Sequence, residues 1–295
     1  MSDTVQGAGT AVVPVLPGGP RDRPGPRYRL VATDLDGTLL RGDATVSART
    51  RAALRRIRAA GAEHVIVTGR PARGCLPFFA ALDYRGLAVC GQGAQIYDAG
   101  RGTLLSSTVL DRSAARAALR RLDARVGPLD LAVVTSGADA EFVVSDGFCR
   151  GDERELAPYR TVDRTGLWDQ PVDKVLLRHR TLSDGALTEA ALRCAGPGLT
   201  VVHAGPRMVE LLPAGFDKAT GLAQVARTLG LTADDVIAFG DMPNDLPLLH
   251  WAGHAVVMAN GHPDLKAAAD EIAPANDDDG VAQVLERILD QGAHP

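Results

Sequence analysis

The sequence of 295 residues has few of the features that mark secreted, metal–thiolate or membrane-spanning proteins. Its four cysteines, at positions 75, 90, 149 and 194, are scattered, and no two form a Cys-x-x-Cys pair. This spacing indicates neither a disulfide framework nor a zinc site, and it favours a cytoplasmic location. No stretch approaches the roughly 18 uninterrupted apolar residues of a membrane-spanning helix, so we expect no membrane partner.

The chain also lacks a surplus of positive charge. Lysine and arginine number 32 against 36 acidic residues, which gives a formal net charge of −4. A broad basic surface of the kind that binds nucleic acid is therefore not expected. Lysine occurs only at positions 174, 218 and 266, so a lysine within a motif is more informative here than in most chains.

The N-terminal segment does not have the composition of a signal peptide. Residues 1–27 are rich in glycine and proline. They lack the basic start and long apolar stretch that a signal peptide contains. We therefore expect 1–27 to be a flexible tail that precedes the folded protein.

The most informative motif is a pair of aspartates, Asp34 and Asp36, at the end of an apolar run over 28–33. The run predicts a buried strand, and Gly37 allows the backbone to turn sharply after it. Side chains two residues apart on a strand share a face, so the two carboxylates can converge on one site. An acidic strand end beside a turn glycine is common by itself. The polar segments further along the chain are what favour a functional interpretation.

Three later segments place polar groups at the ends of other predicted elements. Thr68 and Gly69 follow a predicted strand over 63–67, and Lys218 begins a predicted helix that extends to about residue 229. The segment 240–245, which contains two aspartates and an asparagine, follows a predicted strand over 236–239. In an open α/β sheet, ligands bind at the carboxyl edge of the strands, so these groups are expected to lie together.

Strands and helices alternate along the chain, which predicts an α/β fold with a parallel, Rossmann-like core. We expect the core to be discontinuous, over 28–94 and 206–292, with an inserted α/β cap domain over 95–205. Within the insert, helices are predicted near 112–126 and 183–195. Strands are predicted at 131–135, 141–145, 174–178 and 199–203, and the apolar run 208–212 is interpreted as the strand that returns to the core.

The segment 91–96 superficially matches a dinucleotide-binding loop. It lacks the final glycine of that motif, and no acidic residue lies on a following strand to bind a ribose. Dinucleotide binding is therefore not predicted.

Together, these motifs resemble those of the haloacid dehalogenase superfamily of phosphohydrolases, and within it the Cof-like subfamily with a type IIB cap. The resemblance extends from about residue 28 to 289 and is weakest in the middle. It implies a Mg²⁺-dependent phosphatase. The implied Mg²⁺ ligands are the Asp34 carboxylate, the Asp36 carbonyl and the Asp241 carboxylate, with Asp245 holding a metal-bound water from the second shell.

The resemblance also implies catalytic roles. Asp34 would be the nucleophile that forms an aspartyl-phosphate, and Asp36 the general acid and then the base. Thr68, Gly69, Lys218 and Asn244 would bind the phosphate, with Thr68 and Lys218 also counted as catalytic. Gln92 stands where relatives have asparagine, and the acidic run 277–279 fits either a family loop or an exposed turn.

The predicted function is hydrolysis of a small phosphorylated metabolite: a sugar phosphate, a flavin or vitamin phosphate, or a nucleotide. The alternative function is that of a phosphomutase or phosphotransferase acting on a sugar phosphate. A third hypothesis is that the chain is a non-catalytic binding protein. A dehalogenase is disfavoured because, by the same resemblance, that chemistry does not keep an acid at position 36. We expect a monomer or a homodimer.

Overall fold

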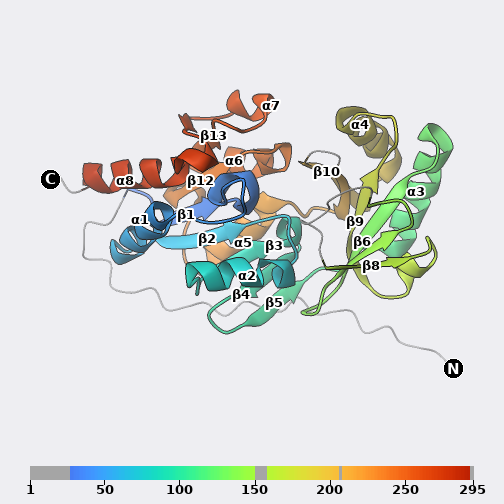
Figure 1. The fold of residues 1–295 in the computed structure, drawn as a ribbon, viewed down its shortest axis with the longest axis horizontal. Coiled ribbons are helices and arrows are strands. Elements are labelled where there is room, and N and C mark those ends of the chain that lie inside the picture. Colours follow the sequence, from blue (N-terminus) through green and yellow to red (C-terminus); the bar gives the residue numbers. More distant parts are fainter. Residues whose placement is uncertain (1–26, 150–157, 206–207, 293–295) are drawn as a thin grey trace.

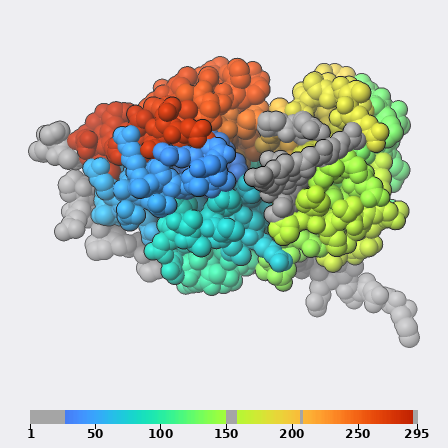
Figure 2. Space-filling model, in the orientation of Figure 1, coloured from blue at the N-terminus to red at the C-terminus, as the bar shows by residue number. Residues whose placement is uncertain are grey.

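The computed structural model describes residues 27–149, 158–205 and 208–292, and its two units lie side by side (Figures 1 and 2). We call them the core and the cap, and define them below by their strands. The predicted flexible tail over 1–27 lies outside the described residues, apart from Arg27.

In the described residues the core contains an eight-stranded sheet with the order β14-β13-β12-β1-β2-β3-β4-β5. Strands β14 to β3 in this order pair in parallel, and β4 and β5 continue the edge as an antiparallel pair. The strands are β1 (Leu30–Thr33), β2 (Glu63–Val67), β3 (Leu87–Cys90), β4 (Gln95–Asp98), β5 (Thr103–Ser107), β12 (Val236–Gly240), β13 (His254–Met258) and β14 (Glu271–Ala273).

Helices cover both faces of the core sheet, because successive strand residues point to opposite faces and both sets of residues are apolar. Val31 packs on the face with α1 (Ala48–Ala59), α2 (Ala72–Leu82) and α8 (Gly280–Gly292). Leu30 and Ala32 pack on the face with α5 (Lys218–Thr228), α6 (Leu246–Trp251) and α7 (Pro263–Lys266). Strands buried on both faces are typical of a parallel α/β sheet, so the predicted Rossmann-like core is confirmed.

The cap contains a second sheet with the order β10-β11-β9-β6-β7-β8. Helices α3 (Arg112–Val126) and α4 (Asp184–Ala195) pack on one of its faces (Figure 1). The other face carries a separate apolar cluster that includes Val144, Leu176 and Met208. The strands are β6 (Asp130–Thr135), β7 (Phe142–Ser145), β8 (Tyr159–Val162), β9 (Val172–Arg178), β10 (Leu199–Gly205) and β11 (Met208–Pro213).

Strand pairing corrects both predicted boundaries of the insert. β4 and β5 belong to the core sheet, although 95–205 was assigned to the cap, because β4 pairs antiparallel with β3. β11 was interpreted as the return to the core, yet it pairs with β10 and β9 in the cap sheet. An apolar run indicates a strand but does not indicate which sheet the strand joins.

Local signals in the sequence agree closely with the helices of the core. Ser47 caps α1 by accepting a hydrogen bond from the Thr50 N–H, as its position before the helix predicts. Asp217 caps α5 in the same way and thereby fixes where Lys218 begins the helix. Among the described residues, none of the helices combines the length and the hydrophobicity needed to cross a bilayer.

Candidate active site

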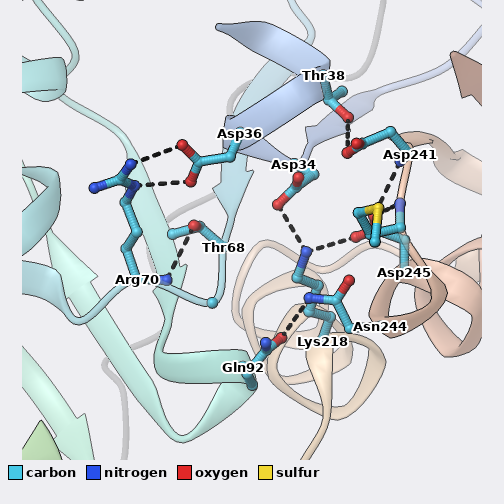
Figure 3. Close-up of polar contacts among 12 residues, drawn as sticks. Asp34, Asp36, Thr38, Thr68, Arg70, Gln92, Lys218, Asp241, Asn244 and Asp245 are labelled. Atoms are coloured by element: carbon cyan, nitrogen blue, oxygen red, sulfur yellow. Dashed lines mark hydrogen bonds and ion pairs between the residues drawn. The ribbon is translucent and has the colours of Figure 1, made fainter. Parts of the chain in front are cut away.

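The site lies at the carboxyl edge of the core sheet, where β1 delivers Asp34 (Figure 3). The Asp34 N–H donates to the Phe239 carbonyl of β12 at 3.0 Å, which joins the ends of the two central strands. The chain then turns through Gly37, whose φ is +74°. A Cβ at Gly37 would lie 2.3 Å from Asp241 Oδ2, so only glycine allows Asp241 to approach the turn.

Three carboxylates gather at this edge. Asp34, Asp241 and Asp245 each offer an oxygen atom, and these atoms all lie within 4.8 Å of one another. All three residues are buried. Thr38 donates its hydroxyl to Asp241 Oδ1 at 2.9 Å, which fixes one of the three.

Lys218 is the cation that balances part of this charge. Its ammonium group is almost fully buried and donates to Asp34 Oδ1 at 2.7 Å and to Asp245 Oδ1 at 2.6 Å (Figure 3). The other oxygen of Asp245 accepts the N–H groups of Asp241 and Met242, each at 3.0 Å. Asp245 therefore holds both the lysine and the loop that carries Asp241.

The protonation of these groups reflects their burial. Burial raises the pKa of the Asp34 carboxyl well above its ordinary value, against the opposing effect of Lys218. Burial and the charge of Asp245 together raise the pKa of Asp241 to about 6. Burial alone would lower the pKa of Lys218, but Asp245 and Asp34 outweigh it and raise that pKa.

A divalent cation fits this cluster. Three buried carboxylates face one ammonium group, so the cluster keeps an uncompensated negative charge when all are ionised. Like charges in a buried site repel strongly, and a cation bound among their oxygens would remove the repulsion. The donor set contains only oxygen, which suits a hard cation.

The predicted phosphate-binding groups lie beside the carboxylates. Thr68 follows β2 and is buried, and its hydroxyl accepts a hydrogen bond from the Arg70 N–H at 3.1 Å. Asn244 lies on the opposite side, in the short 3₁₀ turn Pro243–Asp245. Thr68, Gly69, Lys218 and Asn244 all line one cavity together with Asp34 and Asp241.

Asp36 is placed apart from the carboxylate cluster. Its side chain is half exposed and forms a two-pronged ion pair with Arg70, at 2.7 Å from Nε and 2.8 Å from Nη2 (Figure 3). No role was predicted for Arg70 from the sequence, although Arg70 directly follows Thr68 and Gly69. The available signal was an arginine two residues after Thr68, the threonine predicted to bind phosphate.

The structure also shows a buried polar network that was not predicted from the sequence. Lys174 on β9 forms a short ion pair with Glu210 on β11 and donates to the Gly69 carbonyl at 2.9 Å. Glu210 also accepts from Gln92 Nε2 at 2.9 Å, and Gln92 Oε1 accepts from Asn244 Nδ2 at 3.1 Å. The network therefore joins two cap strands to both sides of the predicted phosphate site. One of only three lysines, within an apolar strand, was a signal for it.

The acidic run 277–279 belongs to a different contact. Asp277 accepts the Gly42 N–H at 2.8 Å, and Asp279 pairs with Arg41 at 2.8 Å. These bonds fasten the loop that follows the Asp34 turn to the start of α8. Neither the cavity nor the carboxylate cluster includes residues of this run.

The cavity between core and cap has a volume of about 340 Å³. Asp34, Asp241, Lys218 and Thr68 line its core side. Residues of β7, β9, β10 and β11 form its cap side. The site is therefore shared between the two units: the carboxylate cluster and Lys218 come from the core, and the ion pair of Lys174 with Glu210 comes from the cap.

The comparisons with known proteins all indicate the same family. A sequence model of haloacid dehalogenase-like hydrolases matches residues 31–285. The chain is 30% identical to the HMP-PP phosphatase of Serratia proteamaculans, over 81% of this chain and 87% of that protein. It is 27% identical to a 5-amino-6-(5-phospho-D-ribitylamino)uracil phosphatase of Bacillus subtilis, over 88% of this chain and 98% of that protein.

A solved structure agrees in fold. The structure of a sugar phosphatase of HAD subclass IIB superposes with a TM-score of 0.74, at 19% identity, over 88% of this chain and 98% of that one. At this identity the likeness concerns the fold alone. It agrees with the arrangement of core and cap seen in Figure 1.

Proposed function

The chain belongs to the haloacid dehalogenase-like hydrolases and is a phosphatase, and from this premise we propose that it hydrolyses small phosphorylated metabolites through a phosphorylated Asp34 with the help of Mg²⁺. The observation that carries the proposal is the placement of Lys218 between Asp34 and Asp245, with Asp241 beside them. Phosphoryl transfer needs an in-line nucleophile and neutralisation of the phosphate charge, and this group of side chains can supply both.

In the first step, an oxygen of Asp34 attacks phosphorus while the bond between phosphorus and the ester oxygen breaks. Lys218 stabilises the charge on the phosphoryl oxygens, with the Thr68 hydroxyl, the Gly69 N–H and the Asn244 amide as further donors. Asp36 supplies the proton that the leaving alcohol takes up. For this, Asp36 separates from Arg70, with which it is paired in this structure.

In the second step, Asp36 takes a proton from water, and the water oxygen attacks phosphorus. The bond to Asp34 breaks, and inorganic phosphate leaves. The overall reaction converts ester and water into alcohol and phosphate. Asp34, the Asp36 carbonyl and Asp241 would hold Mg²⁺, which would screen the repulsion between carboxylate and phosphate. Both oxygens of Asp245 already hold protein donors, which supports its place behind the direct ligands.

We further propose that the cap, as defined by its sheet, selects the leaving group, because its strands line the cavity opposite the phosphate site. By their names, the relatives act on HMP-PP and on 5-amino-6-(5-phospho-D-ribitylamino)uracil. We extend from them only the general class of small phosphorylated metabolites.

The test is a panel of phosphate esters, with inorganic phosphate release measured after chelation and again after Mg²⁺ or Ca²⁺ is added. We expect turnover with Mg²⁺, none in excess chelator and inhibition by Ca²⁺, whose longer and looser coordination misplaces the attacking carboxylate. Interconversion of sugar phosphate isomers without phosphate release would favour a mutase instead. A lack of turnover on every ester would indicate a non-catalytic protein.

A further inference from the structure

The cap side of the cavity is mostly apolar where it faces the phosphate site. Phe142, Leu176 and Met208 come from the three strands β7, β9 and β11, and all three line the cavity. Leu176 and Met208 belong to the apolar cluster on the cap face not covered by α3 and α4, and Phe142 packs against it. Met242 lines the cavity from the core. A leaving group attached to phosphate at Asp34 would therefore meet apolar side chains.

The polar side chains on the cap side, among the described residues, are already engaged. Only Lys174 and Glu210 are charged there, and they bind each other. Lys174 also donates to Gly69, and the second oxygen of Glu210 accepts from Gln92. A sugar with several hydroxyls placed against Phe142, Leu176 and Met208 would leave most of them without a protein partner, and an unpaired buried hydroxyl weakens binding.

The shape and chemistry of the wall suit a ring. A cavity of about 340 Å³ lies at the small end of ligand pockets, which span roughly 300–1,000 Å³. It therefore suits a phosphate with a compact attached group. Aromatic rings pack edge-to-face or offset against phenylalanine, and methionine sulfur makes favourable contacts with ring edges. Phe142 offers the first kind of contact, and Met208 and Met242 offer the second.

We propose that this wall is a subsite for a flat, weakly polar ring, so that the preferred substrates are phosphomonoesters of ring-bearing alcohols and not polyhydroxylated sugar phosphates. The proposal rests on the proposed phosphatase function and narrows its substrate class. The juxtaposition that carries it is an apolar wall of Phe142, Leu176 and Met208 that faces the proposed phosphate site and has one ion pair as its only charged groups among the described residues.

The experiment compares two primary alkyl phosphates whose leaving alcohols are of similar reactivity, 2-phenylethyl phosphate and glucose 6-phosphate. We expect kcat/KM for phosphate release to be at least about tenfold higher for the phenylethyl ester. Met208→Gln, which keeps the length but adds an amide, should reduce that preference several-fold. Met208→Leu should retain it. Leu192→Gln is a matched control, because Leu192 lies exposed on α4 outside the cavity lining.

Equal or better turnover of glucose 6-phosphate by the wild type would overturn the ring subsite while leaving the phosphatase function intact. An unchanged preference in Met208→Gln would also overturn it. If neither ester is hydrolysed and the wider panel gives no phosphate, the proposed function fails, and the subsite fails with it.

Discussion

At the residue scale, the site depends on one lysine that is buried among carboxylates. An unpaired buried charge is costly, so Lys218 is retained in the interior only because Asp34 and Asp245 accept its hydrogen bonds. The same arrangement keeps Asp34 in one orientation, with its Oδ1 bound to the ammonium group. Precise orientation of a nucleophile lowers the barrier that its approach must overcome. The ion pairs therefore explain both the fixed positions of the side chains in the site and the proposed reactivity of Asp34.

We predict that Asp34→Asn abolishes phosphatase activity, with a loss of about 10⁴-fold or more in kcat, because an amide is a poor nucleophile. Lys218 keeps its bond to Asp245 in this variant, so the fold should persist. Steady-state kinetics checks the activity, and circular dichroism checks the fold. A folded variant with more than a trace of activity would remove Asp34 from the nucleophile's role.

At the element scale, strand β2 carries a buried histidine near its amino end. The His64 Nε2 atom lies 2.9 Å from the Thr33 hydroxyl of β1, and its ring contacts Tyr84 edge-on. Burial, with a smaller effect from Arg58, lowers the pKa of His64 to about 3. His64 is therefore neutral in the folded protein at any pH above this value and takes up a proton only when the strand leaves the core.

This shift makes the stability of the fold depend on pH. Below about pH 6.5 the unfolded chain binds a proton at His64 and the folded chain does not, so the free energy of unfolding falls as the pH falls towards 3. Between about pH 7 and pH 5 the loss from this residue should be about 2 kcal/mol. Well above pH 6.5 the residue contributes almost no slope, because it is neutral in both states. His64→Gln, whose amide can still reach Thr33, should lack this loss.

Urea unfolding of both proteins across this pH range measures the effect. The two stability curves should converge at low pH or cross, and they should run parallel above about pH 7. Parallel curves throughout would show that His64 is protonated equally in both states, which would contradict its burial.

At the scale of the whole molecule, the cap is joined to the phosphate site by the network of Lys174, Glu210 and Gln92. It connects strands β9 and β11 to Gly69 on one side and Asn244 on the other. These bonds cross from one unit to the other, so they form only when cap and core are together. Closure of a cap excludes water and strengthens electrostatic contacts at the phosphate. The network thus links the position of the cap to the geometry of the loop that we propose binds phosphate.

We predict that Lys174→Met weakens the binding of vanadate, a phosphate analogue, by about tenfold or more, and that it also destabilises the protein by about 3 kcal/mol because Glu210 is left unpaired. In the double variant Lys174→Met/Glu210→Met the stability should largely return, since both charges are gone. The vanadate affinity should stay low, because Gly69 and Gln92 have still lost their partners.

The control is Asp173→Asn, on the same strand. Asp173 is equally buried, but its carboxylate accepts hydrogen bonds from Gln95 and Ser107 and not from Lys174, Gln92 or Gly69. It should alter stability with little effect on vanadate binding. Recovery of vanadate affinity together with stability in the double variant would show that the network only supports the fold.

The sequence predicted those features that depend on local pattern and on motif order. Ser47 and its helix, the strand before Asp34, and the convergence of Asp34, Lys218 and Asp241 all follow from such signals. The sheet membership of β4, β5 and β11 did not, because strand periodicity carries no information on pairing partners. The pairing of Asp36 with Arg70 also escaped prediction, since a side-chain contact over 34 residues depends on how two loops meet.

The central claim is that Asp34 carries the phosphoryl group during turnover. The most direct measurement is acid quenching of the enzyme during reaction with Mg²⁺ and a hydrolysable ester, followed by mass spectrometry of the peptide that contains Asp34. The account predicts a mass increase of one phosphoryl group on Asp34, which disappears when the substrate is exhausted and is missing in Asp34→Asn. Rapid phosphate release with no phosphorylated Asp34 at any quench time would contradict it.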